Sequence, residues 1–149
     1  MSVVEPFSLA MVERYIQKRG WKFLRDQDGD YRVDFAYSDE RGCSLSLWMI
    51  AEGAESEIYT VRVYSDKRIP RDDWMHVIRL CNEWNRDRRW PKAYLHAPSD
   101  EEMLTAPVHL EYQIDLETGI HQELLEHLTE SILSSSHAFW MWMAEEHDI

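Results

Sequence analysis

Glycine is scarce in this 149-residue chain, and its five glycines never cluster. A glycine-rich phosphate loop is therefore missing, as are a serine nucleophile elbow and a cysteine with a histidine in a catalytic context. No apolar run approaches the ~20 residues that a membrane helix needs, and no signal peptide is visible. The sequence therefore predicts a protein that is soluble, cytoplasmic and not an enzyme.

Cysteine and positive charge are also in short supply. The two cysteines, Cys43 and Cys81, form neither a CxxC pair nor a disulfide framework, which favours two buried thiols in a reducing cytoplasm. Because 28 acidic residues outnumber 16 basic ones, the net charge is −12. This charge argues against a nucleic-acid or anionic-membrane binder, since both recognise phosphate through cations. It favours solubility or a partner with basic patches.

Apolar residues, in contrast, are plentiful and periodic. Hydrophobic residues make up 44% of the chain, which suffices for the core of one domain over residues 1–149. Helical spacing predicts helices over 6–19 and 121–146 and a third that starts at Pro70. Alternating patterns between short turns predict six strands, at 21–25, 31–37, 43–50, 58–64, 92–96 and 108–116.

The resulting order is helix, four strands, helix, two strands, helix. The short connections favour antiparallel hairpins, because parallel crossovers need about a dozen residues or more. The fold class is therefore α+β, an antiparallel sheet with helices packed on it. The expected buried stripe of the middle helix is Trp74, Val77, Ile78, Cys81 and Trp84. That of the last helix is Leu124, Leu125, Leu128, Ile132, Leu133 and Phe139.

Two acidic clusters resemble metal sites only at first sight. Asp26, Asp28 and Asp30 alternate like calcium ligands, but the sixth and twelfth positions of an EF-hand loop would hold tyrosines here. A solvated hairpin turn is the better interpretation. His121 and His127 are six residues apart, whereas a zinc-binding helix needs a spacing of four. No metal or cofactor is therefore predicted.

One basic cluster, Arg86 to Lys92, includes three arginines and Trp90. It could contact RNA or another anion by charge and stacking, although the overall charge disfavours nucleic acid and makes an acidic protein segment the better candidate. Alternatively, these cations complement the helix dipole and Trp90 anchors the core.

The run Phe139-Trp140-Met141-Trp142-Met143 covers every side of a helix, because five residues advance about 500°. Either this part of the helix is deeply buried, or it contacts a second subunit or a partner. Insertion into a membrane surface is disfavoured by the acidic residues that follow.

The sequence resembles the YbjN-type family of bacterial proteins, labelled sensory transduction regulators. The resemblance is carried by Asn82-x-Trp84-Asn85, by Pro91-Lys92-Ala93-Tyr94, and by the segment from Leu110 to Ile120. It implies a fold like that of type III secretion chaperones, which commonly form homodimers. It carries over no catalytic residue.

Asn82 and Asn85 are near neighbours on the predicted helix, since residues three apart share a face. We interpret them as groups that tie the helix end to the following strand by side-chain bonds to backbone. The alternative is a sensor domain that binds a small ligand near Asn82, Asn85 and Arg86.

The function that we expect is a non-catalytic, homodimeric adaptor or chaperone-like regulator that binds a segment of another protein. Tryptophan dominates interface hot spots, so the expected contact residues are Trp48, Trp90, Trp140 and Trp142.

Overall fold

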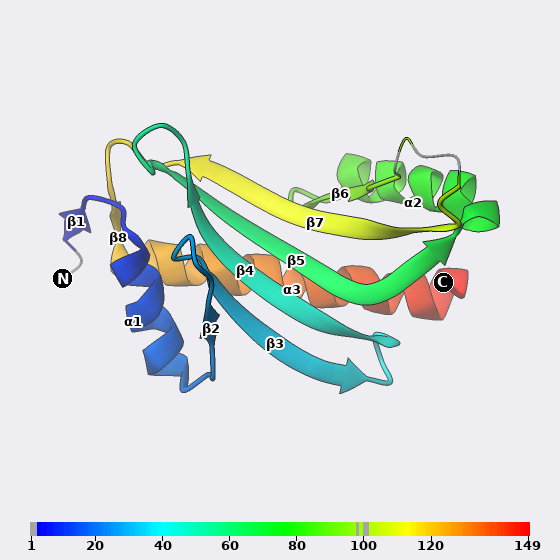
Figure 1. Ribbon diagram of the computed structural model, residues 1–149, viewed down its shortest axis with the longest axis horizontal. Coiled ribbons are helices and arrows are strands. Elements are labelled where there is room, and N and C mark those ends of the chain that lie inside the picture. Colours follow the sequence, from blue (N-terminus) through cyan, green and yellow to red (C-terminus); the bar gives the residue numbers. More distant parts are fainter. Residues whose placement is uncertain (1–2, 98, 100–101) are drawn as a thin grey trace.

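A computed structural model describes residues 3–97, 99 and 102–149 (Figure 1). The elements in chain order are β1 (Val4–Glu5), α1 (Leu9–Arg19), β2 (Leu24–Arg25), β3 (Tyr31–Ser38), β4 (Cys43–Glu52), β5 (Ile58–Pro70), the 3-10 turn η1 (Arg71–Asp73), α2 (Trp74–Asp87), β6 (Lys92–Leu95), β7 (Thr105–Asp115), β8 (Ile120–His121) and α3 (Gln122–His147).

Six of the strands form one antiparallel sheet in the order β2-β3-β4-β5-β7-β6. This arrangement confirms the predicted α+β class and the order of its main elements. The strand expected at 21–25 is only the two-residue β2, which pairs with the first residues of β3. A small ladder between β1 and β8, which the sequence did not predict, joins the N-terminus to the start of α3.

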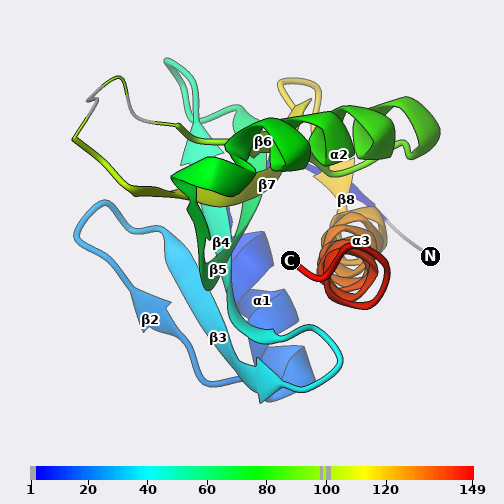
Figure 2. The ribbon, with the colours of Figure 1, turned by 90° about the vertical axis from the view of Figure 1, so that its right-hand side faces the viewer.

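One face of the sheet forms the core. Val33, Leu47, Val63, Leu110 and Ala93 are neighbours in a single row across five strands, and all are buried. Figure 2 shows α1 and α3 on this side of the sheet, while α2 lies beside β6. Because side chains alternate along a strand, the other face carries the polar residues between these positions.

The helices bury nearly the stripes that their spacing predicts. In α1, Met11, Val12, Tyr15 and Ile16 are buried, as their spacing indicates. The prediction for Leu124 is wrong: its side chain is 39% exposed, because it lies in the first turn of α3, next to the short β8.

In α2 the buried residues are Val77, Leu80, Cys81 and Trp84. The prediction for Ile78 is wrong, since it is 44% exposed. Because α2 lies beside the edge strand β6, only part of its apolar stripe is covered, and Ile78 lines a hollow next to that strand.

Strand β5 is six residues longer than predicted. A register shift against β7 between Tyr64 and Arg68 interrupts the alternation of side chains, so the polar run from Ser65 to Lys67 hides the continuing strand. Beyond the irregularity, Ile69 is again buried. The extended strand ends at Pro70, and only the short turn η1 separates it from the start of α2.

Both cysteines are buried free thiols, as predicted, and burial raises the pKa of Cys81 to about 12. Within the described residues, no helix is both long enough and apolar enough to span a bilayer.

Candidate partner-binding surfaces

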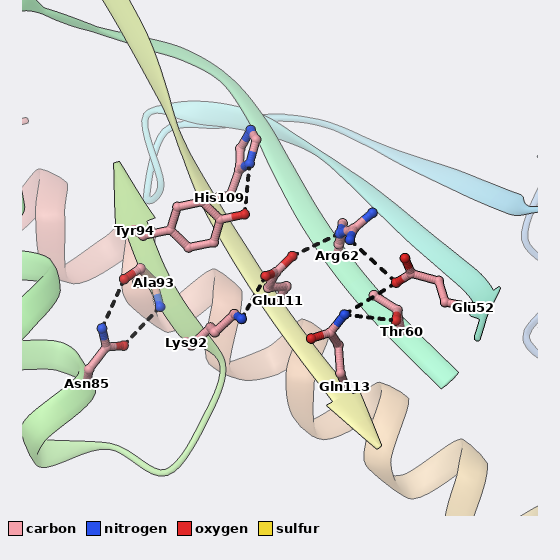
Figure 3. Close-up of polar contacts among 10 residues, drawn as sticks. All are labelled: Glu52, Thr60, Arg62, Asn85, Lys92, Ala93, Tyr94, His109, Glu111 and Gln113. Atoms are coloured by element: carbon pink, nitrogen blue, oxygen red, sulfur yellow. Dashed lines mark hydrogen bonds and ion pairs between the residues drawn. The ribbon is translucent and has the colours of Figure 1, made fainter. Parts of the chain in front are cut away.

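The end of α2 is fastened to β6 by two side chains. The carboxamide of Asn85 accepts a hydrogen bond from the backbone N–H of Ala93 and donates one to its C=O, each 2.9 Å long (Figure 3). The buried indole N–H of Trp84 donates to the backbone C=O of Pro91 at 3.0 Å. The predicted tie between helix and strand is thus confirmed for Asn85.

This bond also protects the edge of the sheet. The backbone N–H of His96 donates to the C=O of Pro107, next to the β6–β7 ladder. Because the peptide groups of an antiparallel strand alternate in direction, those of Tyr94 and Lys92 face β7 as well, and those of Ala93 point outward. An outward edge is a template for unwanted strand pairing. Asn85 forms hydrogen bonds with both backbone groups of Ala93, so these groups cannot pair with a strand of another molecule.

The structure brings Asn82 and Asn85 to one hollow but leaves Arg86 outside it. The hollow, of about 350 Å³, lies between α2 and β6 and is lined by Ile78, Cys81, Asn82, Asn85, Ala93, Tyr94 and Leu95. Arg86 instead forms a bidentate pair with Asp87 on the surface, at 2.8 and 3.0 Å. The polar groups that a small ligand would need are therefore largely engaged within the protein.

We predict that Asn85→Ala lowers the free energy of unfolding by about 1–3 kcal/mol, because it leaves two partly buried backbone groups of Ala93 without partners. Asn82→Ala is the matched control, three residues earlier on the same helix, and should change stability by less than about 0.5 kcal/mol. Urea unfolding followed by circular dichroism measures both. Equal effects would show that Asn85 does not tie α2 to β6.

The face of the sheet opposite the helices carries an ion-pair network. Glu111 of β7 is only 6% exposed and accepts from Arg62 of β5 at 2.8 Å and from Lys92 of β6 at 3.0 Å (Figure 3). Arg62 also reaches Glu52 at 3.4 Å. Burial alone would raise the pKa of Glu111, but the hydrogen bonds from Arg62 and Lys92 outweigh it and hold that pKa below its ordinary value. Two acids and two cations thus balance across four strands, β4, β5, β7 and β6.

A cluster of aromatic and histidine rings adjoins this network. His109 of β7 stacks on His96, with ring centroids 4.6 Å apart and planes inclined by 14°. Its ring edge meets Tyr64 at 4.7 Å, and its Nδ1 lies 3.4 Å from the hydroxyl of Tyr94. Burial lowers the pKa of His109 and the neighbouring His96 lowers it further, against the attraction of Glu111. The surroundings of His109 therefore favour its neutral form.

This histidine makes stability depend on pH in a definite direction. Because its pKa is lower in the folded protein, the unfolded chain binds the proton first, so stability falls as pH drops below the ordinary histidine pKa of about 6.5. We predict that His109→Phe reduces the loss of unfolding free energy between pH 7.5 and pH 5.5. His127→Asn, at an exposed position of α3, is the control and should leave the loss unchanged. Urea titrations at the two pH values test this.

A groove runs between the C-terminal half of α2 and the middle of α3. Its central hollow has a volume of about 490 Å³ and shares lining residues with neighbouring hollows of about 380 and 130 Å³. The indole rings of Trp84, Trp90 and Trp142 line the groove together with Ser135 and Ala138 of α3. Its size and aromatic walls are typical of binding sites.

Two of the four tryptophans predicted as contacts, Trp90 and Trp142, line this groove. Trp48 lies elsewhere, on the open face of the sheet, where the guanidinium of Arg32 is 5.7 Å from its ring centroid. Trp140 is fully buried at 0% exposure, so a partner cannot reach it in this conformation. The last helix is thus deeply buried at Trp140 and half-buried at Trp142. Of the four predicted tryptophans, the structure brings Trp90 and Trp142 together at one site.

The acidic motifs of the sequence are occupied by local contacts. Carboxylate oxygens of Asp26, Asp28 and Asp30 lie within 4.8 Å of one another, and one oxygen of Asp26 accepts from the backbone N–H of both Asp28 and Asp30. This is the hairpin turn that the sequence predicts. At the start of α3, the imidazole of His121 accepts from the N–H of Leu124 as a helix cap.

A protein-family model matches residues 8–145 of the chain. The chain belongs to the YbjN family. The family is described as "Putative bacterial sensory transduction regulator", a regulatory or adaptor role in which no reaction is named. This confirms the resemblance carried by the sequence around Asn82-x-Trp84-Asn85.

Among solved structures, the fold is similar to the "Crystal structure of YbjN, a putative transcription regulator from E. coli". The TM-score is 0.74 and the identity 9%, with 98% of this chain and 97% of that chain covered. At such low identity the likeness shows the fold alone. The further likeness to type III secretion chaperones stays a prediction. None of the curated proteins matches this chain.

Proposed function

We propose that this YbjN-family protein is a non-catalytic, homodimeric adaptor that holds a segment of another protein in the groove between α2 and α3. The observation that carries the proposal is the groove itself, where Trp84, Trp90 and Trp142 converge from α2, the following loop and α3. Tryptophans in a concave surface are the usual anchors of protein interfaces.

The packing around the groove favours a binding role, because contacts between aromatic rings hold its walls together. The ring centroids of Trp84 and Phe139 are 5.2 Å apart, and those of Trp84 and Trp142 are 5.9 Å apart, so α2 and α3 are held by contacts between rings. The ring of Trp90 packs against that of Tyr112 of β7, with ring centroids 6.1 Å apart, and this contact holds the loop after α2 against the sheet. A preformed site loses little conformational entropy when a partner binds.

The small-ligand sensor is the weaker candidate. Its hollow beside β6 exists, but the carboxamide of Asn85 already binds Ala93 and Arg86 already binds Asp87. A ligand site needs convergent polar groups that remain available. Three tryptophans line the α2–α3 groove, whereas Tyr94 is the one aromatic residue among those described that lines the hollow beside β6, so the groove is preferred.

We predict that p-benzoylphenylalanine placed at Ser134, which lines the groove, forms a covalent crosslink to another protein when the cells that produce it are irradiated. The reason is proximity, since the photoreactive ring would lie within the partner interface. The same amino acid at Gln113, exposed on the open face of the sheet, is the control and should give no such product. Crosslinked bands are detected by blotting and identified by mass spectrometry. Absence of a product specific to Ser134 would contradict the proposed site.

We also predict a homodimer, on the basis of the resemblance to chaperones that commonly dimerise. Light scattering of the pure protein should give twice the chain mass of 17.9 kDa at micromolar concentration. Trp142→Ser in the groove should not alter this mass if the groove receives a different protein. A monomer would remove the homodimer from the proposal, and a dimer that dissociates on Trp142→Ser would assign the groove to the second subunit.

A further inference from the structure

Two arginines stand at the groove outside the close ion pairs of the described residues, although the charge of Arg88 reaches Asp87, whose pKa is lowered mainly by the hydrogen bond from Arg86. Arg88 and Arg89 line its central hollow, and neither forms an ion pair with any described residue of the chain, 3–97, 99 and 102–149. The guanidinium of Arg88 lies over the ring of Trp84, 5.2 Å from its centroid, which orients the cation at the groove. These charges are therefore available to a bound molecule.

Two carboxylates that line the same groove are already neutralised. Asp87 accepts the bidentate pair from Arg86, and Glu130 pairs with Arg19 of α1 at 2.9 Å. Glu83 lines the neighbouring hollow of about 130 Å³, together with Arg88 and Trp142, and not the central one. In a chain of net charge −12, the centre of this groove is thus a local site of positive charge. Charge complementarity selects an occupant with carboxylates at its middle.

The shape of the groove indicates the form of this occupant. Lining residues of α3 extend from His127 to Trp142, and at 1.5 Å per residue this span is about 22 Å. A helix of about 15 residues has that length. The groove lies between two helices and has indole walls, which suits an amphipathic helix whose apolar side chains enter it.

From these observations we infer that the α2–α3 groove binds an acidic amphipathic helix of a partner protein. Apolar side chains on one face of that helix contact Trp90 and Trp142, which are half-buried, beside the small exposed edge of Trp84. Aspartate or glutamate near the middle of that helix, at the edge of its apolar face, pairs with Arg88 and Arg89, because guanidinium groups bind carboxylates through two parallel hydrogen bonds. The inference rests on the proposed function and names the chemistry of its partner.

The test is a selection that does not presume a partner sequence. A phage library of random 16-residue peptides is selected on the immobilised full-length protein, and the enriched peptides are synthesised with fluorescein for anisotropy titrations. We expect enrichment of Asp and Glu, with apolar residues at helical spacing. Arg88→Gln/Arg89→Gln should weaken binding about tenfold, because two partly exposed ion pairs are lost. Arg79→Gln, which removes a positive charge from the exposed side of α2 away from the groove, should change affinity less than about twofold.

Ser135→Trp, which fills the groove without changing charge, separates the inference from the proposed function. Peptides without acidic enrichment whose binding survives Arg88→Gln/Arg89→Gln but is lost on Ser135→Trp would overturn the acidic partner and leave the adaptor in place. Peptides insensitive to both changes would place binding outside the groove and overturn both. A selection without enriched peptides would overturn the inference, whereas crosslinking from Ser134 would still decide the proposed function. Tight binding of a single-stranded oligonucleotide that competes with the peptides would also overturn it.

Discussion

The side chain of Trp84 makes the contacts on which the candidate site depends. Its indole N–H bonds to the backbone C=O of Pro91, so the end of α2 is fixed to the start of β6. Its ring packs edge-on against Phe139 and obliquely against Trp142, which sets the distance between α2 and α3. Arg88 lies over the same ring. One buried side chain thus links the sheet edge, the spacing of two helices and the position of a cation in the groove.

Side chains alternate between the two faces of the sheet, and the two faces contribute to stability in different ways. The buried face is continuous and apolar, so it provides the hydrophobic stabilisation of the fold. The open face has a nearly buried carboxylate, Glu111, whose burial would be costly without partners. Because Arg62 and Lys92 are its cross-strand neighbours, the register of β5, β6 and β7 itself supplies the compensating charges. Pairing of the right charges therefore also favours the right register.

The sequence predicts elements well where the physics is local. The order of strands and helices and the role of Asn85 both follow from spacing over a few residues. The α3 stripe is incomplete because Thr129, a polar residue, is buried against the core: its hydroxyl lies 2.7 Å from that of Tyr59, seventy positions away. Such a partner is invisible to helical periodicity. The same holds for the long β5, where a bulge breaks the alternation that marks a strand.

The groove illustrates the corresponding limit for the site. Trp90 and Trp142 are both predicted as contact residues, but their meeting depends on how α2 and α3 pack, which no local pattern encodes. Trp48 and Trp140 have the same residue type and end on the open face and in the core, respectively. Residue type thus nominates candidates, and tertiary packing assigns them to sites.

An acidic partner for an acidic protein is consistent with electrostatics once distance is considered. At physiological ionic strength the Debye length is about 8 Å, so the net charge of −12 is largely screened beyond the first layers of solvent. Within contact distance, Arg88 and Arg89 dominate the field, since Asp87 and Glu130 already have cationic partners. Screening leaves only a weak repulsion at longer range, which does not prevent an acidic segment from approaching, and only a segment that reaches both guanidinium groups gains the short-range attraction. The local charge of the groove therefore selects partner segments whose shape and charge pattern both match it.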